Sequence, residues 1–262
     1  MGGAYSYIAL KDRAAVKANL RVIFPHYSRR KISKITNRVF INFAKYLVDF
    51  FRFEKLDKEY IKKNVKIEGI DYLNKAISKN RGVIMGSAHI GNWELGAVVL
   101  AQLGYDINVV ALNHRHKNVD DFFTKQRQIK GVKSIKFGGA LRKCFVCLKR
   151  GGLLALVGDR DYFGKGIPME FFGRESIIPR GLSVLGLKFG APIVPTFLIR
   201  NPDETFTFKF YAPIETDGAL HDLENVKNIT KRFIDVMEEE VKTYPDQWYV
   251  FRRFWEKIEW KI

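Results

Sequence analysis

The chain has 262 residues, 47% of them apolar and 28% charged, a composition that suits one large domain with or without a terminal appendage and excludes a disordered chain. No run approaches the eighteen or so apolar residues that span a bilayer, and no signal peptide is visible. The formal net charge of +17 is concentrated in residues 1–63, where 15 Lys/Arg face 5 Asp/Glu, so this region is expected to attract an anionic membrane or a nucleic acid.

The first predicted element is an amphipathic helix from Ile32 to Phe53. Two interpretations of its apolar stripe stay open, packing on the main domain and lying on a membrane, and one helix can do both. Aromatic residues at helical spacing favour a membrane partner, because nucleic-acid platforms usually interleave aromatics with glycine and basic residues on a sheet. The apolar positions recur every three or four residues, at Ile35, Val39, Phe43, Tyr46 and Phe50.

After Asn80 the pattern becomes an alternation of strands and helices, which predicts an α/β fold with a layered, mixed and largely parallel sheet flanked by helices. We expect a basic, amphipathic helical region over residues 1–64 and one α/β unit over 65–262. Strands are predicted at Val83–Ser87, Ile107–Leu112, Ser134–Phe137, Leu153–Val157, Ile193–Ile199 and Thr205–Tyr211, and a polar, glycine-rich loop runs to Pro168. Helices are predicted at Trp93–Leu103, Val119–Lys130, Ala140–Lys149, Gly181–Phe189, Leu223–Thr243 and Trp248–Lys261.

The segment from Gly86 to Glu94 lies where a predicted strand gives way to a helix, the place at which α/β sheets build sites. His89 and Glu94 would point about 140° apart on one continuous helix, since each residue turns ~100°. They can pair only if His89 lies in the connecting turn, with Gly91 easing the backbone and the helix beginning near Asn92. Glu94 would then accept from one imidazole nitrogen and leave the other as a base. The alternative is a surface histidine and a glutamate placed for the helix dipole.

Other chemistries have weaker support. His114 and His116, with His89 and Glu94, could form a zinc set, but Arg115 is a poor neighbour for a cation. Cys144 and Cys147 form a lone C-x-x-C in an apolar helix, which favours a buried structural pair; two cysteines without a disulfide framework fit a reducing, cytoplasmic setting. The loop from Gly158 to Gly166 has the wrong spacing for a P-loop and lacks its Ser/Thr. No G-x-S-x-G elbow occurs, so a serine acyl-enzyme has no evident nucleophile.

Several motifs in register resemble the bacterial lipid A biosynthesis acyltransferase family, within the wider lysophospholipid acyltransferase superfamily. The resemblance rests on His-x4-Glu within Ala88 to Glu94, and it covers nearly the whole chain. Further matching segments are Arg-x3-Gly at Arg127 to Gly131, the strand-end Asp159, Phe171 to Gly173, Pro179 to Gly181, Gly190 to Pro192, and early and late segments at Ala18 to Pro25 and Gln247 to Trp255.

The resemblance implies an O-acyltransferase with the glycerolipid acyltransferase type of fold and a His89–Glu94 catalytic pair. In this expectation His89 removes the proton of an acceptor hydroxyl, and Glu94 orients His89 and stabilises its charged form. The hydroxyl attacks an acyl-carrier-protein or coenzyme A thioester, and no metal or prosthetic group is required. Candidates for substrate binding are Asn92, Arg127, Asp159, Arg160 and Arg180; Arg127 is also a candidate for oxyanion stabilisation, and structural pairing with carboxylates is the alternative for Arg160 and Arg180.

The expected acceptor is a membrane glycolipid such as a lipid A precursor. Asp159-Arg160-Asp161 looks more like the mycobacterial phosphatidylinositol mannoside acyltransferase branch, so that acceptor and a lysophospholipid stay open. Members usually carry an N-terminal membrane helix. This chain is therefore expected on the cytoplasmic face of the bacterial inner membrane, held peripherally on an anionic surface or anchored by a segment absent from it, with no nucleic acid as partner. The non-enzymatic alternative is a basic nucleic-acid-binding protein.

Overall fold

The computed structural model describes residues 9–111, 116–136, 140–162, 164–216, 218 and 220–256. Its centre is a seven-stranded sheet in the order β1-β9-β8-β2-β5-β3-β4, in which only the β8–β9 pair is antiparallel. Because β3 and β4 lie on the far side of β5, strands β2 and β5 are neighbours, although 65 residues lie between the end of β2 and the start of β5. The strands are β1 (Val65–Glu68), β2 (Val83–Ser87), β3 (Ile107–Ala111), β4 (Lys133–Lys136), β5 (Leu153–Val157), β8 (Ile193–Arg200) and β9 (Phe206–Phe210).

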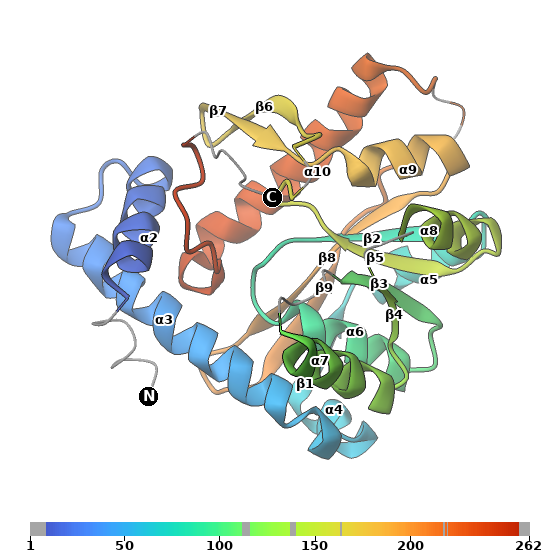
Figure 1. Ribbon diagram of the computed structural model, residues 1–262, viewed down its shortest axis with the longest axis horizontal. Coiled ribbons are helices and arrows are strands. Elements are labelled where there is room, and N and C mark those ends of the chain that lie inside the picture. Colours follow the sequence, from blue (N-terminus) through green and yellow to red (C-terminus); the bar gives the residue numbers. More distant parts are fainter. Residues whose placement is uncertain are drawn as a thin grey trace.

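Helices cover both faces of this sheet (Figure 1). Alternate residues of one strand enter opposite layers: Ile84 packs on one side, and Val83 and Met85 on the other. Both faces are therefore buried, as expected for a largely parallel sheet, and the strands are apolar throughout. One layer holds α5 (Ile70–Ile77), α6 (Trp93–Gln102) and α7 (Lys117–Ile129); the other holds α8 (Ala140–Lys149), α9 (Gly181–Phe189) and α10 (Leu223–Thr243).

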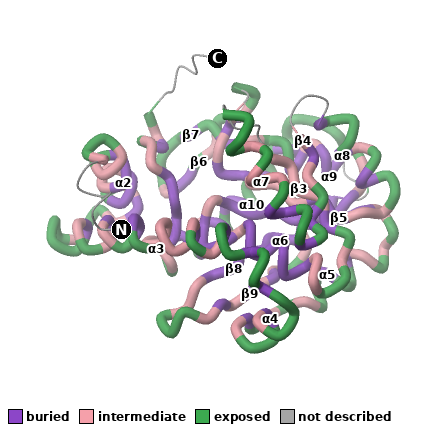
Figure 2. The backbone as a smooth tube through the Cα atoms, turned by 60° about the horizontal axis from the view of Figure 1, so that its bottom comes forward, coloured by how far each residue is buried: buried purple, intermediate pink, exposed green. Residues whose placement is uncertain are grey.

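The N-terminal part is helical, and α3 (Arg29–Phe51) runs along the side of the α/β unit (Figure 1). Its inner face includes Val39 and Phe40, which are buried in a cluster with Tyr249, while its outer residues are exposed, so burial alternates along the helix in Figure 2. Within the described residues, no helix combines the length and apolar character needed to cross a membrane. The other elements here are α2 (Leu10–Ile23), η1 (Phe53–Lys55) and α4 (Lys58–Asn64).

Most predicted elements are confirmed, several with the predicted bounds. The helix predicted from Trp248 to Lys261 is wrong over its described part, since residues 248–256 are irregular and follow a short 3-10 turn, η2 (Pro245–Gln247). The backbone of this segment pairs instead with the turn after β2: Tyr249 N donates to His89 O at 2.8 Å, and Trp248 forms a bridge with Ile90. Residues 257–261 of that prediction, like Leu112 and Phe137, lie outside the described residues.

The sequence analysis missed a β-hairpin between β5 and α9, formed by β6 (Ile167–Phe171) and β7 (Arg174–Ile178). Its two-residue turn, Phe172-Gly173, has positive φ at both positions, which matches the twist of a hairpin. The alternation of apolar residues in β6 was the available signal. Short β1 at the edge of the sheet and α5 were also not predicted. The division of the chain at residue 64 stays a prediction.

Candidate active site

The site begins where two neighbouring strands end. β2 and β5 pair in parallel up to Ser87 and Val157, and Gly158 N donates to Ser87 O at 2.8 Å. His89 follows two residues after β2, and Asp159 two residues after β5. Parallel strands end at one edge of a sheet, so the topology brings the two side chains together, at the edge where α/β proteins bind ligands.

His89 and Asp159 form a tightly bonded pair. The imidazole Nδ1 lies 2.6 Å from Asp159 Oδ1, and Asp159 Oδ2 accepts from His89 N at 3.1 Å and from Trp248 Nε1 at 3.3 Å. The Asp159 side chain is fully buried and that of His89 is 12% exposed. Burial opposes ionisation of Asp159, but the His89 charge and hydrogen bonds, with the Arg160 charge, outweigh it and hold the pKa of the carboxyl well below its usual value.

The predicted pairing of Glu94 with His89 is wrong. Both Glu94 oxygens are bound by the guanidinium of Arg127, with Arg127 Nε to Oε2 at 2.8 Å and Nη2 to Oε1 at 2.6 Å. Glu94 lies in the first turn of α6 and points to α7, while Asp159 takes the role of the carboxylate bound to one imidazole nitrogen, Nδ1. The Glu94–Arg127 pair is nearly buried, and a forked guanidinium on a carboxylate is a strong, oriented contact.

The turn from His89 to Asn92 has the predicted geometry. Asn92 is the N-cap of α6, its Oδ1 accepting from Leu95 N at 3.0 Å, so His89 lies outside the helix. Gly91 has φ +63°, and a Cβ there would lie 2.1 Å from Leu198 O, which leaves room only for glycine. Asn92 is 2% exposed and both ends of its amide are hydrogen-bonded. The structure therefore places this predicted substrate-binding residue in the frame of the turn.

Aromatic rings form one wall beside the imidazole. His89 meets Trp93 edge-on with ring centroids 4.9 Å apart, and Trp93 stacks on Tyr46 of α3 at 4.5 Å. Burial, and then the nearby charge of Glu94, raises the pKa of Tyr46 well above its usual value, so its hydroxyl stays neutral. This wall connects α3 to the turn that carries His89.

Two of the predicted arginines, Arg160 and Arg180, belong to segments close to the His89–Asp159 pair. Arg160 donates to the carbonyl of Tyr249 and, through Nη1, to Tyr162 Oη at 3.3 Å. Its hydrogen-bond partners among the described residues are therefore neutral oxygens, although its charge still acts on the carboxylate of Asp159. Arg180 is exposed at the start of α9. Leu182, two residues further on, packs so closely on Gly158 that a Cβ added there would lie 2.6 Å from the Leu182 side chain, so this end of α9 lies beside the loop that carries Asp159.

Arg252 is a cation near the site that the sequence analysis did not single out. Burial and the neighbouring charge of Arg160 lower its pKa, which Asp159 partly offsets, so these charged groups lie close together. The only sequence signal was its place in the late Gln247 to Trp255 segment. Arg160 and Arg252 therefore bring two half-buried positive charges near the His89–Asp159 pair, offset in part by Asp159 and Asp161.

The two other candidate sites from the sequence are the histidine zinc set and the cysteine pair. His114, needed for the zinc set, lies outside the described residues, and within those that are described no three His, Cys, Asp or Glu side chains gather as metal ligands. Cys144 and Cys147 are buried free thiols, in agreement with the structural interpretation. Burial raises the pKa of each to about 11, assisted by Cys147 in one case and Asp106 in the other.

Comparisons with known proteins show which family the chain is similar to. The chain is 24% identical over 218 residues to a phosphatidylinositol mannoside acyltransferase of Mycolicibacterium smegmatis, covering 82% of this chain and 70% of that one. It is 26% identical over 257 residues to the lipid A biosynthesis palmitoleoyltransferase of Escherichia coli, covering 96% and 82%. The 1-acyl-sn-glycerophosphate acyltransferase PlsC of Thermotoga maritima aligns over 92% of this chain and 98% of its own at 15% identity, with a TM-score of 0.43, a loose likeness.

The family assignment rests on the length of the match as well as on these relatives. The sequence pattern of the bacterial lipid A biosynthesis acyltransferases matches residues 1–257, nearly the entire chain. The enzyme class expected from the motifs is thereby confirmed. This chain belongs to the bacterial lipid A biosynthesis acyltransferase family and is an acyltransferase.

Proposed function

We propose that the protein transfers a fatty-acyl chain from a thioester to a hydroxyl group of a membrane glycolipid, with His89 as the general base. The observation that carries the proposal is the 2.6 Å contact between His89 Nδ1 and the buried, ionised Asp159. A carboxylate at Nδ1 holds the proton on that nitrogen, which leaves Nε2 with its lone pair. Among the described residues, no other hydrogen-bond partner of the ring is found.

The reaction follows from this tautomer. Nε2 takes the hydroxyl proton as the acceptor oxygen attacks the thioester carbonyl carbon, giving a tetrahedral oxyanion and an imidazolium that Asp159 stabilises. The C–S bond then breaks, and the departing thiolate takes the proton back from the imidazolium. The new ester and the free thiol leave, and the base returns to its starting state. No step needs a metal or a prosthetic group.

The role proposed for Glu94 differs from the one first expected. Because Arg127 occupies both its oxygens, Glu94 acts on the shape and charge of the site through Arg127. The arginine carries its positive charge at any physiological pH, and Glu94 compensates it in the nearly buried setting. We assign this pair to holding α6 and α7 together behind the catalytic turn.

The acceptor is proposed to be an anionic glycolipid. Arg160 and Arg252 beside the pair, and the exposed Arg180 at the start of α9, favour a negatively charged head group near the acceptor hydroxyl. Relatives named for lipid A and for phosphatidylinositol mannoside point to the same lipid class. The acyl donor is an acyl-carrier-protein or coenzyme A thioester.

The protein is further proposed to work at an anionic membrane surface, on the cytoplasmic side of the inner membrane. Ile41, Val48 and Phe51 of α3 are 42%, 50% and 60% exposed and recur at spacings that align them on one side of the helix. The exposed basic residues Lys34 and Arg38 belong to the same helix. Apolar side chains beside cations suit the boundary between acyl chains and anionic head groups.

Acyl transfer is tested by incubating the protein with bacterial lipid extract and a labelled acyl thioester, offered separately on carrier protein and on coenzyme A, and identifying the product by mass spectrometry. We expect a labelled glycolipid and a fall in turnover of about 10² to 10⁴-fold in His89→Ala. Undiminished product formation by His89→Ala would refute the general-base role, and a labelled lysophospholipid product would replace the glycolipid acceptor.

Membrane attachment is tested by sedimentation with anionic vesicles. We expect binding that weakens as salt rises and weakens further in Val48→Gln. Leu103→Gln is the matched control, because Leu103 is similarly exposed, at 47%, but lies at the far end of α6 from the catalytic turn. Equal binding of both variants would remove α3 from the proposed surface.

A further inference from the structure

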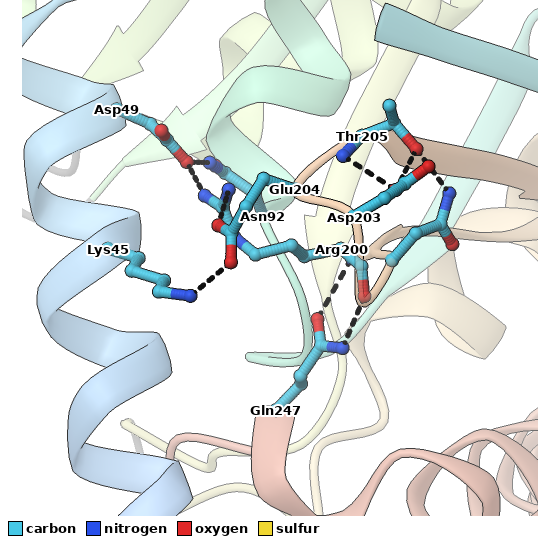
Figure 3. Close-up of polar contacts among 9 residues, drawn as sticks. Lys45, Asp49, Asn92, Arg200, Asp203, Glu204, Thr205 and Gln247 are labelled. Atoms are coloured by element: carbon cyan, nitrogen blue, oxygen red, sulfur yellow. Dashed lines mark hydrogen bonds and ion pairs between the residues drawn. The ribbon is translucent and has the colours of Figure 1, made fainter.

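One carboxylate on α3, Asp49, joins two distant segments around the catalytic turn. Its Oδ2 accepts from Asn92 Nδ2 at 2.9 Å and from the guanidinium of Arg200 at the end of β8. The Asp49 and Arg200 side chains are 14% and 12% exposed, so this ion pair is largely withdrawn from water. In Figure 3 Asp49, Asn92 and Arg200 converge from three separate elements.

Through Asn92 this carboxylate reaches the turn that carries His89. Asn92 follows His89 by three residues, its Oδ1 caps α6, and its backbone N donates to Leu198 O at 2.7 Å. The cap and this backbone bond fix the amide plane. Its Nδ2 is left to point at Asp49, so the position of the carboxylate on α3 is coupled to the place where the turn becomes helix.

Arg200 links the same carboxylate to the other flank of the turn. Gln247 binds both backbone groups of Arg200, accepting from its N at 3.0 Å and donating to its O at 2.8 Å (Figure 3). The carbonyl of Gln247 in turn accepts from Gly91 N at 2.9 Å. Asp49 therefore reaches Asn92 directly and Gly91 through two residues.

A buried ion pair is a costly way to hold three elements together. Burial raises the pKa of Asp49, even though Arg200 and the hydrogen bond from Asn92 favour its charged form. Apolar residues of the same size often stabilise a fold as well as a buried ion pair does, whereas an ion pair also fixes orientation. The nearby Lys45–Glu204 pair joins the same two regions, but its side chains are 39% and 53% exposed, so it is expected to fix little.

We propose that Asp49 is a positioning residue for acyl transfer: through Asn92 and Arg200 it fixes the turn that carries His89, and so aims the imidazole at Asp159 and at the acceptor hydroxyl. This inference rests on the proposed role of His89 as the base. Asp49 touches neither the imidazole nor the reacting atoms, so its effect is on orientation and not on substrate binding.

The kinetic test is Asp49→Asn, which keeps the shape of the side chain and removes its charge. We expect kcat per folded molecule to fall about 10- to 100-fold, with KM values for donor and acceptor changed less than about threefold, because small misalignments of a catalytic group lower the rate of the chemical step. Lys45→Gln is the matched control. It removes the exposed ion pair between the same two regions and should leave kcat within about twofold of wild type.

The second readout is the NMR spectrum of the His89 ring, which needs no activity. We expect Asp49→Asn to shift or broaden the His89 ring resonances, including the proton shared with Asp159, and Lys45→Gln to leave them in place. Asn92→Ser is the second variant, because a serine still caps α6 but loses the amide that reaches Asp49. It should reproduce both effects, and it decides the matter if Asp49→Asn does not fold.

The proposal is overturned if the folded variants keep the wild-type kcat and the wild-type His89 resonances, whatever they do to stability. Its failure is distinguishable from failure of the proposed function. An active wild-type enzyme with unshifted resonances in Asp49→Asn and Asn92→Ser loses only the positioning role. A wild-type protein that transfers no acyl group, yet whose His89 resonances shift in both variants, loses the proposed reaction and keeps the positioning of His89.

Discussion

Two buried carboxylates near the same turn each bind a basic side chain, and the two basic groups differ in what they can do. Asp159 holds the imidazole of His89, and Glu94 holds the guanidinium of Arg127. Guanidinium keeps its proton throughout the range in which proteins are folded, whereas imidazole changes charge near neutral pH. In the proposed reaction the His89–Asp159 pair therefore passes the proton in each turnover, while the Glu94–Arg127 pair holds charge and shape.

A comparison of Asp159 with the two cysteines shows that burial alone does not determine whether a group is charged. Asp159 and the thiols of Cys144 and Cys147 are all removed from water, yet the carboxyl is held in its charged form and the thiols in their neutral form. The imidazole, its hydrogen bonds and Arg160 surround Asp159, and no cation among the described residues hydrogen-bonds to either thiol. Burial disfavours the charged form in all three groups, and only at Asp159 do partners outweigh it.

The largest effect is expected from Asp159→Asn. An amide neither stabilises the imidazolium nor fixes the proton on Nδ1, so kcat should fall by about 10² to 10⁴-fold, in the range of removing general-base catalysis. Steady-state kinetics with saturating donor measure it. Asp106→Asn is the control, because Asp106 precedes β3, at the opposite end of the parallel strands from His89, and its exposed side chain pairs with Lys133. Comparable losses in both variants would contradict a specific role for Asp159.

Glu94→Gln should instead act mainly on stability. It leaves Arg127 in a nearly buried position without its counter-charge, and breaking a buried pair in this way costs about 3–5 kcal/mol of the free energy of unfolding. Urea denaturation measures that loss, and kcat corrected for the folded fraction should fall less than about tenfold. If Glu94→Gln kept its stability and lost as much activity as Asp159→Asn, Glu94 would have to be assigned a direct role in the reaction.

Much of the architecture could be predicted from the sequence, because apolar strands and amphipathic helices alternate with clear breaks. The bounds of β2, α8, β5, α9 and α10 were predicted as they are. The segment after Trp248 was mispredicted because its aromatic spacing looks helical. In the structure those rings enter the core around Phe171 and Phe254, and the backbone bonds with the His89 turn. Tertiary contacts overrode a local pattern.

The site was only half predictable for a related reason. His89, in a turn eased by Gly91 before a helix capped by Asn92, follows from local chemistry. That Asp159 rather than Glu94 binds the imidazole depends on the order of strands in the sheet. In that order β5 lies directly beside β2, although β3 and β4 come between them in the sequence. Asp49 and Arg200 lie 151 residues apart along the chain, and nothing in their local sequence marks them as partners.

The two thiols test the effect of burial where partners do not outweigh it. With the pKa of each raised from 9.0 to about 11, first by burial, the thiolate fraction at pH 8 should be about a hundredfold lower than for an ordinary cysteine. Alkylation of native protein by iodoacetamide should therefore be slow, rise about tenfold per pH unit and continue rising past pH 9. Urea-denatured protein is the control and should react at two sites at the ordinary rate. Fast alkylation at pH 8 would mean that the thiols are not buried.

The smallest effect is expected at Arg180, and it sharpens the contrast between buried and exposed charge. Arg180 is exposed at the start of α9, so its attraction for an anionic acceptor is screened by water and salt. Arg180→Gln should raise the KM for the acceptor about threefold to fivefold at low salt with kcat unchanged, and this difference should fade as sodium chloride is raised toward about 0.5 M. Arg174→Gln, an equally exposed change on the neighbouring hairpin, is the control and should leave KM as it is. A change in kcat that persisted at high salt would instead place Arg180 inside the site, in contact with the reacting groups, and would contradict its assignment to the solvent-screened edge.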